Sequence, residues 1–246
     1  MRPYFQELSG NPASPHQKGR QARKAVEDAR EMLASFIGAL PTEIVFTGSA
    51  TEANNQAIFS SAMAWGSKGR HIVASAIEHH SVLEPLRRLE KYGYKVTYVK
   101  PSADGVVSYE EIASALKPDT ILVCLMHANN EIGTLQPVSE TGRLCRQRGI
   151  VFLVDATQTV GHTLVNVRDL NCDFLSLSAH KLYGPQGVGA LYIRQGIDLP
   201  PYILGGDQEN SRRAGTQNTA GIVGLGSQKS PQEPTGIGQG NCQGSS

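Results

Sequence analysis

The sequence predicts an α/β protein whose mainly parallel sheet is covered by helices on both faces. Short apolar runs alternate along the chain with segments in which apolar residues recur every three or four positions, as strands and amphipathic helices do. Some of these runs, such as residues 120–126, are continuous, which is typical of strands buried on both sides. Strands that alternate with helices form parallel sheets, and ligands bind at the carboxyl ends of such strands.

The first quarter of the chain starts this alternation. A packing helix is expected over residues 19–38, because its apolar positions share one face and it ends at a glycine. Residues 43–47 form the next expected strand. A turn of small residues at 48–51 follows it and opens another helix. Residues 71–75 are a short expected strand.

Two capping boxes mark the middle of the chain. Ser81 and Glu84 have the spacing at which a hydroxyl and a carboxylate bond each other's exposed backbone amides, and so do Ser108 and Glu111. A helix is expected after each box. Between them, residues 95–99 are expected to form a strand.

The second half continues in the same way. Strands are expected at residues 120–126, 150–154 and 174–178, with a helix at 138–147 between the first two. Residues 187–194 close a hairpin-like return onto the last strand. The loops after these strands are therefore the predicted place for chemistry.

Composition limits the possible partners. The chain has 246 residues, is 39% hydrophobic and carries a formal net charge of +1, so it offers no electrostatic footprint for nucleic acid or for an acidic membrane. Its longest apolar runs are too short to cross a bilayer, and its four cysteines form no C-x-x-C pair. We therefore expect a cytoplasmic protein that acts on a small molecule or a protein partner, with no metal site.

The last twenty residues differ from the rest. Residues 227–246 contain almost no apolar side chains and are rich in Gly, Ser, Gln and Pro. Such a composition predicts a disordered polar tail after a domain that covers residues 1–226.

Lys181 is the most informative candidate for chemistry. It follows an apolar strand, has Ser178 and His180 beside it and precedes a glycine-rich return. Pyridoxal phosphate needs an amine to bind its aldehyde and polar groups to bind its phosphate, and this segment offers both. The ordinary alternative is a surface lysine after a buried strand.

Other strand ends offer groups that suit the same cofactor. Asp155 directly follows the strand at 150–154 and could pair with a protonated pyridine nitrogen, although it could also cap a helix. Gln158 and Asn130 could donate to the ring oxygen, or could be ordinary polar residues of a loop and a turn. Five strand-end loops that each offer one required group make a stronger prediction than any single residue does.

Two further loops complete the predicted site. The turn Ser49-Ala50-Thr51 presents backbone amides and a hydroxyl at a helix start, which suits a phosphate as well as a plain helix cap. His79 or His80 could stack on the ring or move protons, while the other is expected to be a surface residue.

The whole set resembles the NifS-like cysteine desulfurases of the class V aminotransferase family. The segments that carry the resemblance occur in family order and extend to about residue 226: Gly10-Asn-Pro-Ala-Ser14 with His16, Phe46-Thr-Gly-Ser-Ala-Thr-Glu-Ala-Asn-Asn55, Glu78-His79, His127-Ala-Asn-Asn-Glu-Ile-Gly133, Val154-Asp-Ala-Thr-Gln158, Ser178-Ala-His-Lys181 and Arg213-Ala-Gly-Thr216.

The resemblance implies a role for each matching residue. Lys181 would bind the cofactor aldehyde as an imine and later move protons, and His79 would stack over the ring. Asp155 would hold the pyridine nitrogen, and Gln158 and Asn130 would contact the phenolic oxygen. The residues expected to bind the phosphate are Ala50, Thr51, Ser178, His180 and, from the neighbouring subunit, Thr216.

The resemblance also implies the fold and the activity. The fold would be the seven-stranded large domain of the fold type I pyridoxal 5'-phosphate enzymes. Family members are homodimers that take sulfur from L-cysteine, leave L-alanine and pass a persulfide to acceptor or iron–sulfur scaffold proteins. A selenocysteine lyase or another class V enzyme is an alternative, and so is a non-catalytic cofactor-binding remnant.

The chain departs from the family pattern at both ends. The family's first loop and its small C-terminal domain, which carries the persulfide cysteine, have no counterpart, so the chain is expected to be truncated and to transfer little sulfur. Cys242 lies too close to Lys181 in sequence to replace that cysteine. In the loop before Arg213, Asp207, Asn210 and Ser211 stand where the family usually has Gly, Arg and Gly.

Overall fold

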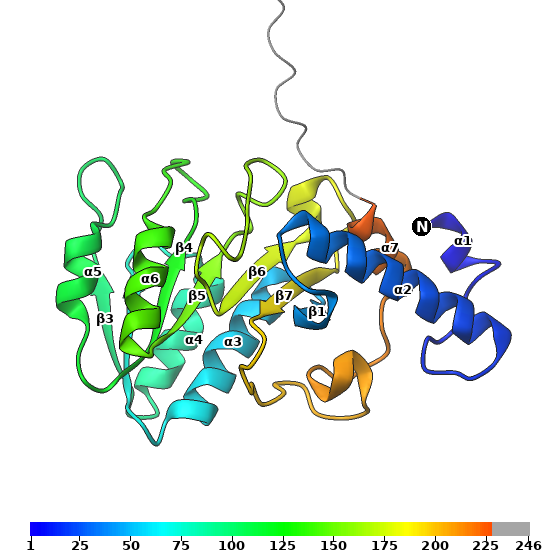
Figure 1. The fold of residues 1–246 in the computed structure, drawn as a ribbon, viewed down its shortest axis with the longest axis horizontal. Coiled ribbons are helices and arrows are strands. Elements are labelled where there is room, and N and C mark those ends of the chain that lie inside the picture. Colours follow the sequence, from blue (N-terminus) through cyan, green and yellow to red (C-terminus); the bar gives the residue numbers. More distant parts are fainter. Residues whose placement is uncertain (228–246) are drawn as a thin grey trace, which may run out of the picture.

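The fold is built on one mixed sheet, seen in a computed structural model that describes residues 1–227. Six strands are parallel to one another, and β7 is antiparallel to both of its neighbours, β1 and β6. This confirms the predicted mainly parallel, seven-stranded α/β fold (Figure 1). The spatial order of the strands is β1 (Ile44–Thr47), β7 (Gly189–Ile193), β6 (Phe174–Ser178), β5 (Val151–Asp155), β4 (Thr120–Met126), β2 (His71–Ser75) and β3 (Lys95–Val99).

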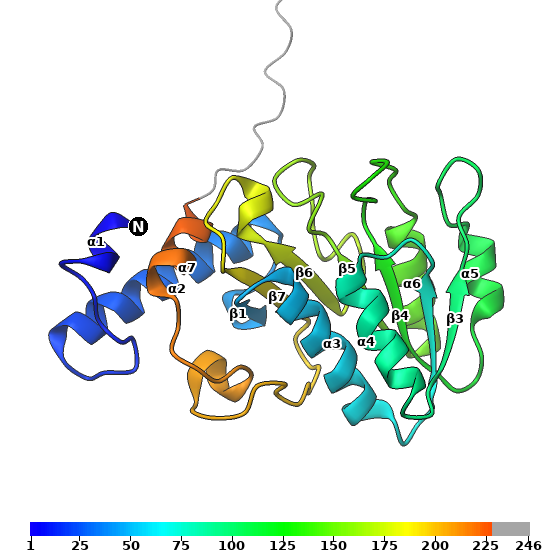
Figure 2. The same ribbon diagram turned by 180° about the vertical axis from the view of Figure 1, so that it is seen from behind.

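Helices cover both faces of this sheet. On one face lie α3 (Ala50–Trp65) and α4 (His80–Glu90), which Figure 2 shows in front. The other face carries α2 (Gln17–Phe36), α5 (Tyr109–Ala115), α6 (Val138–Arg148) and α7 (Thr219–Gly226).

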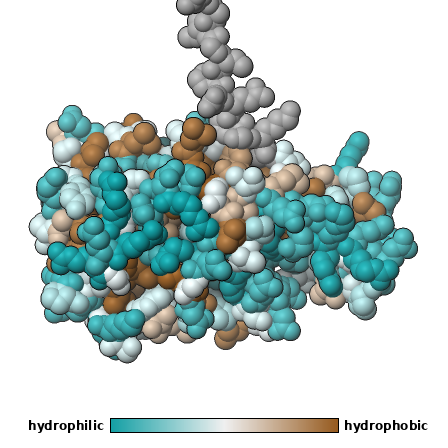
Figure 3. Space-filling model, in the orientation of Figure 1, coloured by the Kyte–Doolittle hydropathy of each residue, from teal (hydrophilic) through white to brown (hydrophobic). Residues whose placement is uncertain are grey.

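Each layer encloses its own hydrophobic core. Ala57 of α3 and Leu86 of α4 pack with Ile72 and Leu122 of the strands. On the opposite face, the apolar side chains of α2, α5, α6 and α7 pack against the other side of the strands. The exposed face over α2, α5 and α6 is mostly hydrophilic, as expected for amphipathic helices (Figure 3).

The expected strands and helices are present, with small differences at their ends. Asp155 is the last residue of β5 rather than the residue after it. The capping box at Ser81 is wrong: α4 begins at His80, and the His79 side chain caps it by accepting from the Ser81 amide. Ser108 does cap α5, because its hydroxyl accepts from the Glu111 amide.

Two helices were not expected from the sequence pattern. The short α1 (Arg2–Phe5) precedes α2, and α7 packs against α2 near the end of the described residues (Figure 1). Asn218 caps α7 by accepting from the Gly221 amide. The predicted polar tail begins at Ser227, the last described residue, and the rest of it lies outside the described residues.

Among residues 1–227, no helix has the length and apolar character that crossing a bilayer requires. A cytoplasmic location remains a prediction.

Candidate active site

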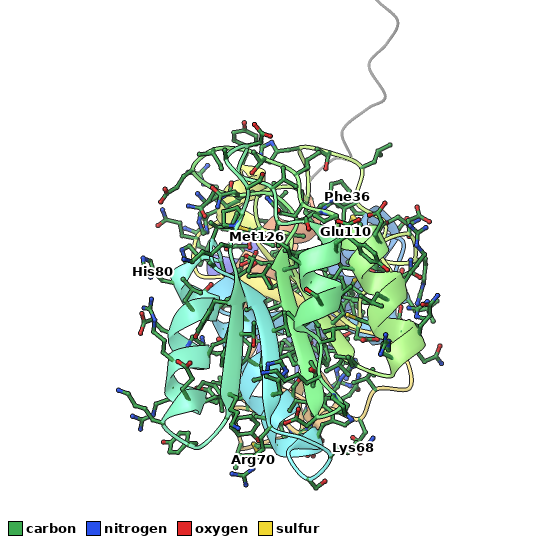
Figure 4. The ribbon with its side chains drawn as sticks, turned by 90° about the vertical axis from the view of Figure 1, so that its left-hand side faces the viewer. Phe36, Lys68, Arg70, His80, Glu110 and Met126 are labelled. Carbon is green, nitrogen blue, oxygen red and sulfur yellow. The ribbon has the colours of Figure 1, made fainter. Side chains whose placement is uncertain are left out.

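A cleft opens where the carboxyl ends of β4, β5 and β6 meet the amino end of α3. It is lined by nine of the ten predicted site residues, all except Thr216. Figure 4 shows Met126, the last residue of β4, near this end of the sheet, whereas Lys68 and Arg70 lie at the opposite end. The structure therefore brings together side chains that are up to 131 residues apart in sequence, from Ala50 to Lys181.

The start of α3 forms one wall of the cleft. The Ser49 hydroxyl caps this helix by accepting from the Glu52 amide, and Ala50 and Thr51 form its first turn. A Cβ atom on Gly189 would lie 2.7 Å from the Ser49 carbonyl carbon, so glycine lets β7 approach this turn closely. The amino end of a helix offers backbone amides and the positive end of the helix dipole to an anion.

Ser178 and His180 lie beside this helix end. The Ser178 hydroxyl and His180 Nδ1 are 2.8 Å apart and bonded to each other, and both residues line the cleft. Hydroxyl and imidazole groups next to a helix amino end suit a phosphate. This agrees with the place predicted for them from the sequence.

Asp155 forms the floor of the cleft and is only 6% exposed. Its Oδ1 accepts from the Thr157 amide at 3.0 Å, and its Oδ2 accepts from the Asn54 side-chain amide at 2.8 Å. Within residues 1–227 no lysine, arginine or histidine forms an ion pair with it. A buried carboxylate without a cation is costly, so this one is suited to a cationic ligand.

Lys181 lies at the rim of the same cleft, in the 3₁₀ turn Ala179–Leu182 that follows β6. Tyr183 ends this turn in the left-handed conformation, and the Lys181 carbonyl accepts from His162 Nε2 at 2.9 Å. In the described part of the chain, the Lys181 amine has no hydrogen bond or ion pair. Its backbone is held in place while its amine is available.

The two histidines differ in position. His79 lines the cleft, whereas His80 does not. The His79 Nδ1 atom accepts from the Ser81 amide at 3.1 Å, so the neutral ring carries its proton on Nε2. His79 is therefore the histidine that can meet a ring bound in the cleft.

The neighbouring residues Asn129 and Asn130 differ in position as well. Asn130 lines the cleft together with Gln158. Asn129 instead shapes the loop, because its Oδ1 accepts from the Glu131 amide at 2.9 Å and its Nδ2 donates to the Ile77 carbonyl at 3.1 Å.

Thr216 lies outside the cleft, in a separate hollow that also contains Gly48 and Arg213. Arg213 binds the Glu52 carboxylate at 2.7 Å, which ties the Thr216 loop to the first turn of α3. This chain therefore does not bring its own Thr216 into the cleft, and the role predicted for it at a neighbouring subunit's phosphate remains a prediction.

Three polar residues of the cleft region had no role at the site predicted from the sequence. Thr157 lines the cleft, and its Oγ1 is buried without a partner within the described residues. Ser81 lines it as well, and Glu78 lies buried nearby. The pKa of Glu78 is raised to about 7, mainly by burial and to a smaller extent by the negative charge of Asp155, against the lowering effect of two hydrogen bonds. The position of Thr157 in the sequence, between Asp155 and Gln158, could have indicated that it lines the cleft.

Comparison with known proteins agrees with this geometry. The aminotransferase class-V family matches residues 1–229. The chain belongs to the class V aminotransferase family. Members of this family are pyridoxal-phosphate enzymes, so the predicted family and cofactor class are confirmed at that level.

Curated relatives of this class V aminotransferase chain are cysteine desulfurases. It is 52% identical over 226 residues to cysteine desulfurase IscS of Dictyoglomus turgidum and 47% identical over 226 residues to that of Methanosarcina thermophila. Each alignment covers 92% of this chain, but 57% and 56% of the relative. The chain thus spans a little over half of the length of these relatives.

Solved structures similar to this class V chain include a NifS-like protein. A structure described as SspA in complex with cysteine has a TM-score of 0.89 and 42% identity, with 92% of this chain and 65% of that chain covered. A NifS-like protein has the same TM-score and identity, with 62% of its chain covered. These matches confirm the fold type I architecture.

The residues of this class V site fit the family's cofactor. The floor offers the buried Asp155 carboxylate, which has no ion pair within residues 1–227, for a ring nitrogen, and the rim offers the Lys181 amine, which has no partner there, for an aldehyde. The helix amino end with Ser178 and His180 offers donors for a phosphate. The orphaned Thr157 hydroxyl is one more polar group that a bound molecule could satisfy.

The three thiols among residues 1–227 are not suited to accept sulfur. Cys124, Cys145 and Cys172 are all buried. Burial raises the pKa of each thiol, that of Cys145 to about 12, so none is a ready thiolate. Cys242, which we did not expect to act, lies outside the described residues.

Proposed function

We propose that residues 1–226 form the cofactor-binding large domain of a cysteine desulfurase, an enzyme that removes sulfur from L-cysteine and leaves L-alanine. The observation that carries this proposal is one cleft with the buried carboxylate of Asp155 on its floor and the amine of Lys181 at its rim, neither of which forms an ion pair in the described part of the chain. The names of the curated relatives favour cysteine desulfurase over a selenocysteine lyase.

The chain's own residues would bind the cofactor at three points. Ala50, Thr51, Ser178 and His180 would bind the phosphate, and Asp155 would keep the ring nitrogen protonated. When bound, pyridoxal phosphate supplies a ring that stabilises negative charge on the substrate's α-carbon.

Two side chains would complete the substrate chemistry. Conversion of cysteine to alanine exchanges the sulfur on the β-carbon for a proton. The Lys181 amine, once the substrate amine displaces it, would accept the α-carbon proton and return one to the β-carbon. His79, with its proton on Nε2, would lie against the ring. Asn130 and Gln158 would orient the ring through its oxygen.

Sulfur transfer needs one more group, a thiolate that takes the sulfur atom and becomes a persulfide. The three described thiols are buried and protonated, so they do not serve. We therefore propose that this polypeptide on its own binds the cofactor but transfers little or no sulfur. With a sulfur-accepting thiolate supplied by a partner, iron–sulfur cluster assembly is the process that the relatives' name, IscS, suggests.

Titration with pyridoxal phosphate tests the proposed cofactor site. The full chain should gain a visible absorption band that Lys181→Ala lacks, while Lys68→Ala, at the opposite end of the sheet, keeps it. A folded parent protein that stays colourless would support the non-catalytic remnant instead. Rapid sulfide release from L-cysteine would contradict the proposed lack of sulfur transfer.

We further propose a homodimer in which Thr216 reaches the cofactor phosphate of the neighbouring subunit. Its position outside its own chain's cleft supports this arrangement. Light scattering of the purified chain should give twice the monomer mass, and Thr216→Val should weaken cofactor binding without changing that mass. A monomer that binds the cofactor tightly would contradict the proposal.

A further inference from the structure

A chain of hydrogen bonds links the floor of the cleft to its histidine. Asp155 Oδ2 accepts from Asn54 Nδ2 at 2.8 Å, and the same nitrogen lies 2.9 Å from Ser81 Oγ. Ser81 Oγ in turn lies 2.8 Å from His79 Nδ1. Asn54 comes from α3, Ser81 from α4 and Asp155 from β5, so the chain joins three elements.

The direction of each bond follows from the groups at the two ends. An ionised Asp155 carboxylate can only accept, so Asn54 must present its NH₂ group to it rather than its carbonyl. At the other end, the Ser81 backbone amide donates to His79 Nδ1, so this nitrogen carries no proton. The Ser81 hydroxyl must then donate to Nδ1 and accept from Asn54.

The buried Asn54 side chain stabilises this arrangement but lowers the stability of the fold. It is completely buried, and its Oδ1 has no hydrogen-bond partner in the described part of the chain. A buried unsatisfied polar atom destabilises a fold by about 1–3 kcal/mol. Packing alone would be served better by an apolar side chain at this position. Both donors of the amide are used, and both point toward the cleft's functional groups.

We propose that Asn54 and Ser81 are positioning residues that set the Asp155 carboxylate and the His79 ring as one unit. Asn54 fixes the carboxylate that would meet the ring nitrogen, and through Ser81 it fixes the tautomer and orientation of the imidazole that would meet the ring face. The role of Asn54 and Ser81 in cofactor binding rests on the proposed function.

Nitrogen NMR of the histidine rings in the cofactor-free full chain tests the linkage without any turnover. At about pH 8.5, where imidazoles are ordinarily neutral, His79 should give one protonated Nε2 signal and one unprotonated Nδ1 signal, assigned by their loss in His79→Gln. Asn54→Leu, which is similar in size and replaces a residue bonded to Ser81 and Asp155, should shift these signals. Ser61→Ala, which changes another buried polar residue of α3 away from His79, should not.

Ser81 supplies a second, independent pair of variants. Ser81→Ala removes the hydroxyl link and should move the His79 ring signals toward a mixture of tautomers, whereas Ser81→Thr keeps the hydroxyl and should restore them. If Asn54→Leu does not fold, this pair decides the question. Unchanged His79 signals in both Asn54→Leu and Ser81→Ala would overturn the proposal, because a structural role alone would not require any change there.

Cofactor binding provides the functional readout. Asn54→Leu removes one hydrogen bond to the charged Asp155, and we expect about tenfold weaker binding of pyridoxal phosphate, measured by absorbance titration. Equal affinities of Asn54→Leu and the parent would overturn the positioning role. If the parent itself does not bind the cofactor, the proposed function fails, while the ring signals still decide whether the linkage exists.

Discussion

Two buried carboxylates in this molecule have nearly the same exposure but opposite surroundings. Glu209 is 4% exposed and Asp155 is 6% exposed. Glu209 receives two hydrogen bonds from Arg30, at 2.7 and 3.1 Å, and one from the Phe46 amide at 2.9 Å. Asp155 receives only neutral donors from residues 1–227. The difference separates a group that holds the structure together from one that we propose meets a cationic ligand.

The loop around Glu209 explains why it needs strong partners. Glu209, Asn210 and Ser211 all have positive φ, at 52°, 55° and 61°. Non-glycine residues in this left-handed region cost energy that surrounding contacts must offset. The Arg30 pair joins this loop to α2, 179 residues earlier in the chain.

Removal of the cation from the paired carboxylate should have the largest effect. Arg30→Ala leaves Glu209 buried and uncompensated, which should lower the free energy of unfolding by about 3–5 kcal/mol. Urea denaturation measures this loss. Arg30→Ala together with Glu209→Gln should recover part of it, and a single variant as stable as the parent would show that the pair does not hold the loop.

Glu78 is another buried carboxyl that, like Asp155, has no ion pair within residues 1–227, and it predicts a pH dependence. Its pKa is raised from 4.5 to about 7, mainly by burial. Between these values the unfolded state ionises while the native state stays protonated, so stability should fall as the pH rises from about 4.5 to about 7. The total loss is on the order of 3 kcal/mol.

Urea unfolding at a series of pH values checks this expectation. In the parent chain the Met126 amide donates to Glu78 Oε1 at 2.7 Å. Glu78→Gln keeps an acceptor for this amide and should remove the Glu78 contribution to the change of stability with pH. A parent and variant with parallel pH profiles would contradict it.

Removal of the Asp155 charge should weaken cofactor binding more than it changes the stability of the fold. Asp155→Asn should change the free energy of unfolding by less than about 1 kcal/mol, because no ion pair is lost. Cofactor affinity should fall about ten- to a hundredfold, since a charge-assisted hydrogen bond contributes about 1.5–3 kcal/mol. Absorbance titration and urea denaturation of the same preparation measure both, and a large loss of stability with unchanged affinity would reverse the assignment of the two carboxylates.

Relief of the strained loop should have the smallest effect. Ser211→Gly should raise the free energy of unfolding by about 0.5–1 kcal/mol, because glycine adopts positive φ without steric cost. Asn210→Gly is the matched control and should gain less, since asparagine tolerates this region better than serine. Thermal denaturation compares them, and a destabilised Ser211→Gly would show that the serine hydroxyl contributes more than its conformation costs.

The sequence by itself determined the layered α/β fold and most of the cleft. Lys181, Asp155 and His79 could be predicted because each lies at or soon after the end of a short apolar strand, and the carboxyl ends of parallel strands meet at one edge of a sheet. That argument needs only local patterns.

Only the tertiary structure decided which polar groups are paired. Asn54 reads as one more polar residue of a helix, and its bond to Asp155 spans 101 residues. The Arg30–Glu209 pair spans 179. The use of Ser81 by Asn54 and His79, rather than by its own helix as a cap, also depends on how α3 and α4 pack. Periodicity and turn chemistry encode contacts within one element, whereas partners from different elements are set by the packing of the whole sheet.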